Sequence, residues 1–467
     1  MGSSAVGDGQ LGTRLTRLVG SGRRRGLAAG LLALMALPGC STFNSIGNTL
    51  AGTPRAQVGE EGFVRGFLGY VVADEPRAAT VARTVLSTGG TALDAATAAG
   101  LTMAVTLPSR AGLGGGGACV LYNPARNAAE AVLFPPGPRS GVPAGADRPA
   151  AVPMLARGLF ALHTRGGRLP FEQLIAPAEQ AARFGIEVSR AFAADLAAVS
   201  GPLFEDPWAV AAFGGANGRP PQVGERLVQA DLGVTLATLR TAGVGDLYQG
   251  SLARRLEEAS VPAGGGLTVA EMRASVPRVV PPAQQRLGSD IVSILPAELD
   301  GGQDTASAFQ AAMAGGAPGA GGAAMLPASA ALVVMDRQGM AVSCVFTMNN
   351  LFGTGRVAPG TGILLGAAPN IGQVRPPLYA AGIVHNSNVR AFRAGAAGTG
   401  QEMAALAAGT ALARLMRGQP AQAAVASLPE PGRASAIGCP RYMPGDAATC
   451  SAATDQRGAG LALGGLE

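Results

Sequence analysis

The feature that most constrains the fold is a glycine run, Gly112-Leu-Gly-Gly-Gly-Gly117, in the stretch SRAGLGGGGACVLYNP. Its letters match the G-x-G-x-x-G pattern of dinucleotide-binding loops. Such loops need a strand before the glycines and a helix after them, because the helix N-terminus holds the pyrophosphate. Here the Ala-rich stretch before the run is typical of a helix that stops at Pro108, and the apolar run after it predicts a strand. We therefore rank nucleotide binding last among the possible functions.

Composition excludes one further class of partner. The chain has 467 residues and 48% hydrophobic content, which is enough to bury a large core. All 36 of its basic residues are arginines, several of them close to the N-terminus, and the net charge is +6. Aromatic residues make up only 4% of the chain, and no basic stripe is interleaved with them. We therefore expect no nucleic-acid partner.

The N-terminus carries a targeting signal. RRRGLAAGLLALMALPGC combines a positive region, an apolar run from Leu27 to Leu37 and a cleavage site that ends in Cys40. It resembles a bacterial lipoprotein signal peptide, although a plain secretory peptide and a membrane anchor remain alternatives. The lipoprotein interpretation makes residues 1–39 the signal peptide, Cys40 the lipidated residue and 40–61 a flexible tether. It predicts an exported lipoprotein that is held on a membrane through Cys40 and faces the periplasm.

Because export would place the protein in an oxidising compartment, disulfide bonds are possible among the cysteines after Cys40. Cys439 and Cys450 bracket a short, turn-rich loop and are expected to form a disulfide. Cys119 and Cys344 lie in apolar, strand-like runs and are expected to be separate buried small hydrophobes. Because the chain has only two histidines, we expect no metal site.

The order of elements favours a layered α+β fold. GYVVADEPRAATVARTVLSTGG predicts a strand and then a helix that begins near Pro76 and ends at Gly89-Gly90. Residues 301–328 begin as a possible helix and become a Gly/Ala/Pro tract, which predicts a mobile linker. Two β-rich runs then flank the hairpin signal Asp336-Arg-Gln-Gly339. Helices beside hairpin-type strands indicate antiparallel sheets layered with helices.

Two long blocks resemble the γ-glutamyltranspeptidase family. The stretch from VVADEP to ACVLYN is similar to its N-terminal part, and LVVMDRQGMAVSCVFTMNNLFGTGRVAPGTGILL is similar to the start of its small subunit. The likeness implies an N-terminal-nucleophile hydrolase fold, a four-layer αββα sandwich whose precursor cleaves itself and exposes a catalytic Thr. Residues 62–328 would then be the large-subunit-like region, with the linker at its end, and 329–467 the small-subunit-like region. Gly112 to Gly117 would be sites of close backbone approach beside the catalytic layer.

The resemblance also implies a set of site residues. A hydroxyl is a weak nucleophile, and an N-terminal nucleophile uses its own freed α-amine as the base, so it must follow a cleavable bond and lead into a strand. Ser329 meets both conditions and aligns with the family's nucleophilic Thr. Thr347 aligns with a second Thr that orients the nucleophile, and Asn349 with a substrate-contacting Asn. Gly398 and Gly400 lie where the family has a glycine pair facing the substrate. No cofactor is implied.

Several positions depart from the family pattern. Ser329-Ala-Ala331 replaces Thr-Thr-His, and Pro135 replaces the Arg that binds the γ-glutamyl α-carboxylate, with Arg139 nearby but out of register. The stretch after GILL lacks the Asp that binds the α-amine, and Tyr379-Ala-Ala381 replaces an oxyanion Ser pair. These changes remove charge-assisted bonds to a zwitterionic headgroup, and a lost oxyanion donor typically lowers a rate by about 10²–10³-fold. Glutathione is therefore not expected to be the substrate.

Two functional hypotheses follow. The first is a membrane-anchored γ-glutamyltransferase-like protein with altered or weak amide hydrolysis or acyl transfer on a small amide or γ-glutamyl-like substrate. The second is a non-catalytic relative that serves as a periplasmic binding or scaffold lipoprotein, in which Ser329 is only a linker serine and Asn349 a turn residue. Asp94 is expected to be a structural hydrogen-bonding group. His385 is expected to lie at the surface or at a strand end.

Overall fold

In the computed structural model the described residues are 66–465, apart from 301–302, 317–319, 324, 370 and 373. The expected signal peptide, Cys40 and the tether therefore lie outside the described residues.

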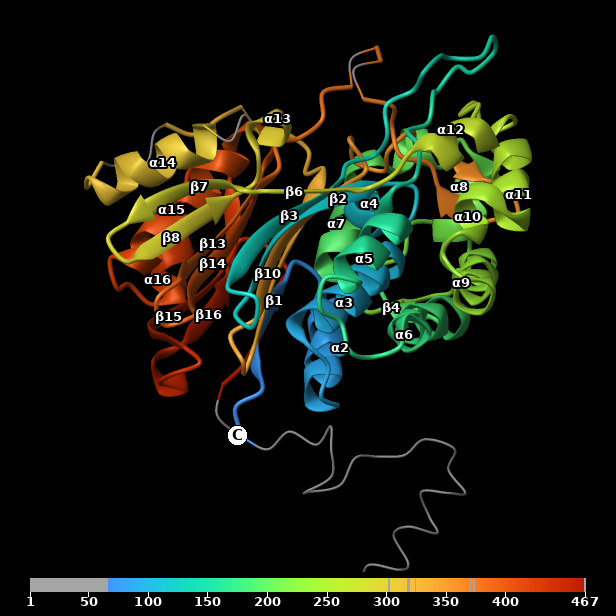
Figure 1. The fold of residues 1–467 in the computed structure, drawn as a ribbon. Coiled ribbons are helices and arrows are strands. Elements are labelled where there is room, and N and C mark those ends of the chain that lie inside the picture. The colour runs from blue at the N-terminus through green and yellow to red at the C-terminus, as the bar shows by residue number, and fades with distance from the viewer. Residues whose placement is uncertain are drawn as a thin grey trace, which may run out of the picture. The chain divides into compact units, whose positions relative to one another are not determined.

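Two antiparallel sheets face each other in the described part of the chain (Figure 1). The first sheet has the order β17-β1-β9-β10-β2-β3-β6, with bounds Leu461–Gly464, Gly69–Ala73, Ser329–Asp336, Ala341–Thr347, Gly116–Asn123, Ala128–Phe134 and Arg278–Val280. The second has the order β16-β15-β14-β13-β8-β7, with bounds Ser451–Thr454, Arg433–Met443, Ala391–Thr399, Ala380–Asn386, Asp290–Ile294 and Ala283–Leu287. Two short two-stranded ladders, β4 with β5 and β11 with β12, have the bounds Ile186–Glu187, Arg226–Leu227, Val357–Ala358 and Ile363–Leu364.

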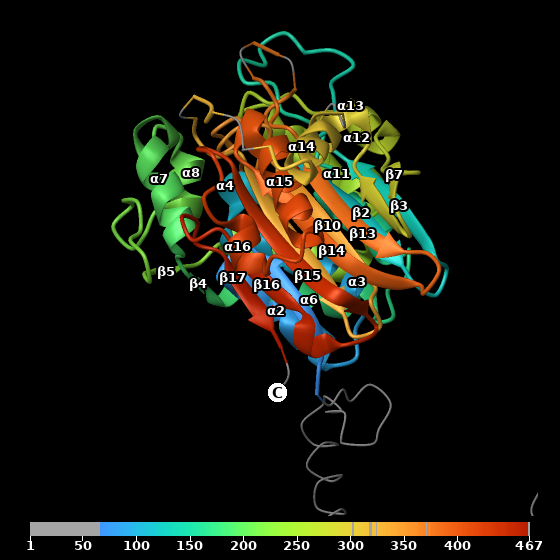
Figure 2. The same cartoon turned by 90° about the vertical axis from the view of Figure 1, so that its left-hand side faces the viewer.

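Helices cover the outer faces of both sheets. The first sheet is covered by α2, α3, α4 and α5, over which α6 packs, with bounds Pro76–Ser87, Ala92–Thr106, Pro108–Ala111, Leu155–His163 and Phe171–Phe184. The second is covered by α14, α15 and α16 (Figure 2), with bounds Gln303–Met313, Ala404–Met416 and Ala421–Val425. The other helices are α7 to α13, η1 and η2, with bounds Arg190–Leu203, Pro207–Phe213, Ala230–Ala242, Asp246–Gln249, Ser251–Ser260, Val269–Ala274, Ala297–Asp300, Gln401–Met403 and Ala447–Thr449. This arrangement confirms the expected four-layer αββα sandwich.

Strand alternation assigns each side chain to one of the apolar cores between the layers. On β9, Leu332 and Val334 belong to the core under the helices, whereas Val333 and Met335 belong to the core between the sheets. Successive strand residues point to opposite faces. By the same period the odd-numbered residues of β9 and β10 face the space between the sheets.

The glycine run lies between a helix and a strand, as the sequence predicts. A Cβ atom on Gly114 would lie 2.1 Å from the carbonyl oxygen of Leu364, and one on Gly115 would lie 2.4 Å from that of Thr347. A Cβ on Gly117 would lie 2.5 Å from the carbonyl oxygen of Val345. Real Cβ atoms essentially never come this close. The glycine run therefore lets neighbouring backbones approach each other where β2 begins, at the end of the strands of the first sheet.

The hairpin and linker expectations can be compared with the described elements. β9 and β10 pair as an antiparallel hairpin, and Gly339 adopts a positive φ of 80° in the turn. Residues 303–313 form α14, and the described residues between α14 and β9 form no helix or strand.

The expectation for Cys119 and Cys344 was wrong, whereas His385 has the strand-end position that was one of its two expected places. Cys119 and Cys344 occupy directly opposite positions on β2 and β10 and are joined by a disulfide, rather than being separate buried thiols. His385 does lie near the end of β13, but it is only 2% exposed and stacks on Tyr122 with ring centroids 4.2 Å apart. Burial lowers the pKa of His385 to about 4. A second disulfide joins Cys439 to Cys450.

Asp94 has the structural role that the sequence predicts. It completes a capping box with Thr91 at the start of α3, and its carboxylate accepts backbone N–H bonds from Arg168 and Leu169. His163 lies 3.3 Å from the same carboxylate. The carboxylate therefore ties the N-terminus of α3 to the loop that precedes α6.

Candidate active site

Ser329 and Thr347 are brought together by the β9–β10 hairpin. They are the first residue of β9 and the last of β10, and they are directly opposite in the ladder. Both side chains belong to the odd-numbered set that faces the other sheet. Ser329 is 1% exposed, and its Oγ is one of the buried side-chain atoms without a hydrogen-bond partner among the described residues. A buried hydroxyl normally has a partner, so an orphaned one calls for an explanation.

The residue before Ser329 is held from both sides. Thr347 Oγ1 donates a 2.6 Å hydrogen bond to the carbonyl oxygen of Ala328, and the Ala328 N–H donates to Gln401 Oε1 at 3.1 Å. A hydroxyl hydrogen bond polarises the carbonyl that it contacts. The Ala328–Ser329 peptide bond is therefore fixed beside the Ser329 hydroxyl, with a donor already on its carbonyl oxygen. Gln401 did not emerge from the sequence, because only the fold places η1 next to this bond.

Asn349 supports Thr347 through the turn that follows β10. Its N–H donates to Thr347 Oγ1 at 2.9 Å, and its side-chain Nδ2 donates to the carbonyl oxygen of Ala367 at 3.0 Å. Its φ is 64°, in the left-handed region that Asn tolerates better than most residues. Thr347 Oγ1 thus accepts one bond and donates another, which orients its hydroxyl toward Ala328.

Gly398 and Gly400 are both explained by close packing. A Cβ on Gly398 would lie 2.2 Å from the carbonyl oxygen of Ala404, and one on Gly400, where φ is 106°, would lie 2.4 Å from that of Pro431. The glycine pair therefore lets β14 and the following turn approach α15 and the start of β15. Thr399, between the two glycines, lines a cavity.

Arg139 does not stand in for the missing family arginine. Its side chain is 1% exposed and forms an ion pair with Glu271 at 3.0 Å, and it also donates to the carbonyl oxygens of Ala150 and Gly265. With Arg139, Thr268 and Ser140 bonded to it, the pKa of Glu271 falls to about 2 in spite of partial burial. The guanidinium of Arg139 is therefore occupied by bonds that connect loops of the fold.

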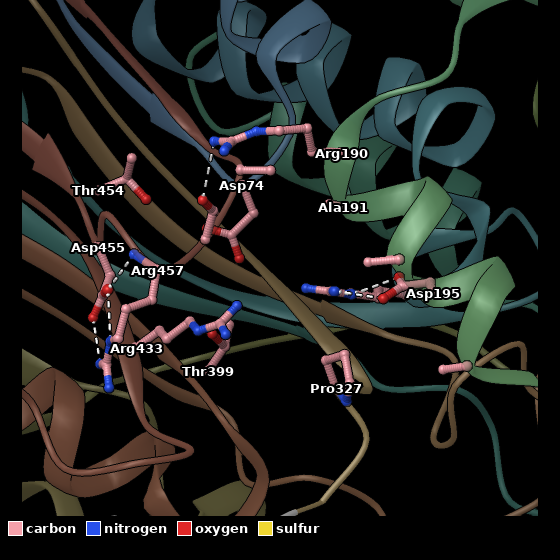
Figure 3. A pocket seen from close by; sticks show the side chains of 15 residues that line it. Asp74, Arg190, Ala191, Asp195, Pro327, Thr399, Arg433, Thr454, Asp455 and Arg457 are labelled. Carbon is pink, nitrogen blue, oxygen red and sulfur yellow. Dashed lines mark hydrogen bonds and ion pairs between the residues drawn. The ribbon is translucent and has the colours of Figure 1, made fainter. Parts of the chain in front are cut away.

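A cavity of about 320 Å³ opens near the Ala328–Ser329 bond, with Pro327 in its wall (Figure 3). Its other polar or charged lining residues are Asp74, Arg110, Arg190, Asp195, Thr399, Arg433, Thr454, Asp455 and Arg457. These residues come from strand ends of both sheets and from α4 and α7. Sequence reasoning missed them because they are scattered over most of the chain.

Asp74 is the acid nearest to β9 in this wall. It follows the last residue of β1, accepts the Ala331 N–H at 2.8 Å through Oδ2, and accepts the Ser435 hydroxyl at 3.2 Å through Oδ1. Burial raises the pKa of Asp74, while the Ala331 N–H and the charges of Arg110 and Arg433 oppose that rise. An acid directly after the buried run GYVVA is the sequence signal that could have indicated it.

Among the described residues, no three or more His, Cys, Asp or Glu side chains cluster closely enough to hold an ion. The chemistry available at this site is that of a hydroxyl beside a polarised carbonyl.

Comparison with known proteins gives one consistent match. The family model described as gamma-glutamyltranspeptidase matches residues 78–312 and 303–369. The chain is 32% identical over 215 residues to glutathione hydrolase 7 of Homo sapiens, covering 43% of this chain and 31% of that protein. It is 27% identical over 226 residues to the glutathione hydrolase proenzyme of Escherichia coli, covering 45% and 39%. The chain thus spans less than half the length of these relatives.

A solved structure matches over a larger part of the chain. The crystal structure of cephalosporin acylase from Bacillus halodurans superposes with a TM-score of 0.68 at 16% identity, covering 93% of this chain and 99% of that one. At this identity the likeness shows the fold alone, and it confirms the N-terminal-nucleophile hydrolase type.

Proposed function

The chain belongs to the gamma-glutamyltranspeptidase family, and on that premise we propose that it hydrolyses or transfers amides with Ser329 as an N-terminal nucleophile. The observation that carries this proposal is the geometry around one peptide bond. The buried Ser329 hydroxyl has no hydrogen-bond partner among the described residues, and the carbonyl that precedes it is already bonded to Thr347 Oγ1 at 2.6 Å.

The first proposed step is self-cleavage. Ser329 Oγ attacks the carbonyl carbon of Ala328, the C–N bond breaks, and the acyl group moves from the Ser329 nitrogen to its oxygen as an ester. The proton of Oγ passes to the nitrogen, which becomes the α-amine. Thr347 donates to the carbonyl oxygen as negative charge develops there. Water then hydrolyses the ester, which leaves a carboxylate on Ala328 and a free α-amine on Ser329.

The second proposed step is catalysis on a substrate amide. The freed α-amine of Ser329 takes the proton from Oγ, and Oγ attacks the substrate carbonyl to form an acyl-enzyme and release the amine. Water or an acceptor amine then removes the acyl group. Asn349 contributes by keeping the Thr347 hydroxyl oriented, since its N–H donates to Thr347 Oγ1.

Glutathione is not the substrate that we propose. Pro135 stands where a carboxylate-binding arginine is expected, and Arg139 is committed to Glu271. A γ-glutamyl headgroup would lack the charge-assisted bonds that normally hold it. We therefore propose another small-molecule amide, and an activity on γ-glutamyl compounds that is weak.

We further propose that the protein is exported and anchored by lipid on Cys40, with its catalytic part in the periplasm. This rests on the N-terminal sequence pattern alone. Within the described residues, none of the helices has the length and apolar character needed to cross a membrane.

The proposed activity is tested with chromogenic amides on the full chain and on two variants. Ser329→Thr restores the family's nucleophile and should keep hydrolysis, whereas Ser329→Ala should abolish it. γ-Glutamyl 4-nitroanilide should be hydrolysed only weakly. Hydrolysis that survives in Ser329→Ala would overturn the assignment of the nucleophile. An uncut chain without amidase activity would favour the binding or scaffold function.

A further inference from the structure

We propose that the cavity beside Ser329 binds a carboxylate of the substrate, held by Arg433 and Arg190. This inference rests on the proposed function, because it gives a substrate class to the site whose nucleophile is Ser329.

Arg433 is on the same side of its sheet as the residues that face the nucleophile. On β15, Ala434 and Ala436 belong to the core under α15, whereas Ile437 and Cys439 belong to the core between the sheets. The odd-numbered residue Arg433 therefore faces the space between the sheets. It lies opposite Thr399 in the ladder, and both residues line the cavity (Figure 3).

The pairing of charges leaves two guanidinium groups available. Asp195 binds Arg110 through both oxygens, at 2.8 and 2.6 Å. Asp455 binds Arg457 at 2.9 and 2.5 Å. These two aspartates therefore neutralise two of the four arginines in the wall.

Arg433 itself is without a partner. It makes no hydrogen bond or ion pair within the described part of the chain, and its Nε is buried. Asp74 acts on it through its charge and not through a hydrogen bond, and the Asp74 oxygens accept bonds from Ala331 and Ser435. Within the described residues, Arg190 makes only a 3.4 Å bond to the carbonyl oxygen of Gly458. Buried arginine nitrogens normally have a hydrogen-bond partner, so the Nε of Arg433 is open to an anionic ligand.

The charge and size of the cavity favour one carboxylate. Four arginines and three aspartates in the wall leave an excess of one positive charge, which matches a monoanion. Glu430 also pairs with Arg457, but it does not line the cavity and its side chain is 63% exposed, so solvent screens it. A guanidinium fork matches the two oxygens of a carboxylate. A cavity of about 320 Å³ admits a small organic acid.

The cavity lies within reach of the nucleophile. Pro327 is in its wall and precedes Ser329 by two residues, which can span at most about 7 Å. A carboxylate bound in this cavity would therefore lie close to the chain segment that carries Ser329. The predicted substrate class is amides that carry a free carboxylate close to the scissile bond.

The test is calorimetric titration of succinate into the full-length Ser329→Ala protein. This variant lacks the hydroxyl that would cleave the chain. The result therefore does not depend on self-cleavage. Succinate should bind, and neutral succinamide should bind much more weakly. Arg433→Met should weaken succinate binding by about tenfold or more. Arg441→Met is the matched control, because Arg441 lies on the same strand, β15, with its side chain 74% exposed. It should bind like the parent.

Arg190→Met is the second variant, because Arg190 is an exposed residue at the start of α7, outside the core. It should also weaken succinate binding, even if Arg433→Met fails to fold. The proposal is overturned if succinamide binds as tightly as succinate, or if neither the Arg190 variant nor a folded Arg433 variant loses affinity.

In the active protein, KM values for succinyl 4-nitroanilide and N-butyryl-4-aminobenzoate show which side of the amide carries the carboxylate. Arg433→Met should raise the KM of one of the two. Unchanged KM values for both would count against the proposal.

Discussion

The hydroxyl of Thr347 can be removed with little change of shape by Thr347→Val. That hydroxyl donates to the Ala328 carbonyl oxygen at 2.6 Å and accepts the Asn349 N–H at 2.9 Å. All of these groups are buried, and each partner left unpaired costs about 1–3 kcal/mol. Loss of the donor to a developing oxyanion lowers a rate by about 10²–10³-fold. We therefore expect self-cleavage of the Ala328–Ser329 bond to slow by about that factor.

The assay follows cleavage over time on denaturing gels, starting from freshly purified protein, with circular dichroism to show that the variant is folded. Thr347→Ser is the matched control, since it keeps the hydroxyl and loses only a methyl group, and it should cleave at close to the parent rate. If folded Thr347→Val were cut as fast as the parent, the assigned role of Thr347 would be wrong.

Two further predictions concern stability. Arg110 and Asp195 form an ion pair at 2.6 Å, with side chains 9% and 2% exposed. Because removing one partner leaves a buried charge unpaired, Asp195→Ala should lower the free energy of unfolding, measured in urea, by about 3–5 kcal/mol. A loss under about 1 kcal/mol would contradict this prediction. Burial raises the pKa of Asp336 to about 6. Between about pH 4 and about pH 6 the folded state therefore keeps a proton that the unfolded state has released. The free energy of unfolding should fall as pH rises through this range. Asp336→Asn should remove up to about 3 kcal/mol of that fall, which urea unfolding across this pH range would measure. An unchanged pH dependence would show that Asp336 does not have the raised pKa.

Local signals allowed the β9–β10 hairpin and a layered arrangement of antiparallel sheets and helices to be predicted from the sequence. The four-layer form and the proposed roles of Ser329 and Thr347 came from the family resemblance. The turn signal Asp336–Gly339 fixes the register of its two strands, and this register places Ser329 opposite Thr347. The helix before the glycine run and the strand after it were also clear from composition and punctuation. In each case residues close in sequence determine the outcome.

Features that depend on contacts between distant segments could not be predicted. The Cys119–Cys344 disulfide requires β2 to pair with β10 in one particular register. His385 is buried because Tyr122 stacks on it from the other sheet. The cavity joins residues as distant in sequence as Asp74 and Arg457, and no local pattern marks them as neighbours.

The central claim is that Ser329 becomes an N-terminal nucleophile. The most direct test is the intact mass of the purified protein on a denaturing separation, compared with that of Ser329→Ala. Two fragments are expected from the parent, the smaller one beginning at Ser329, and a single uncut chain from the variant. A parent protein that stays uncut, or that is cut at another bond, would contradict the account.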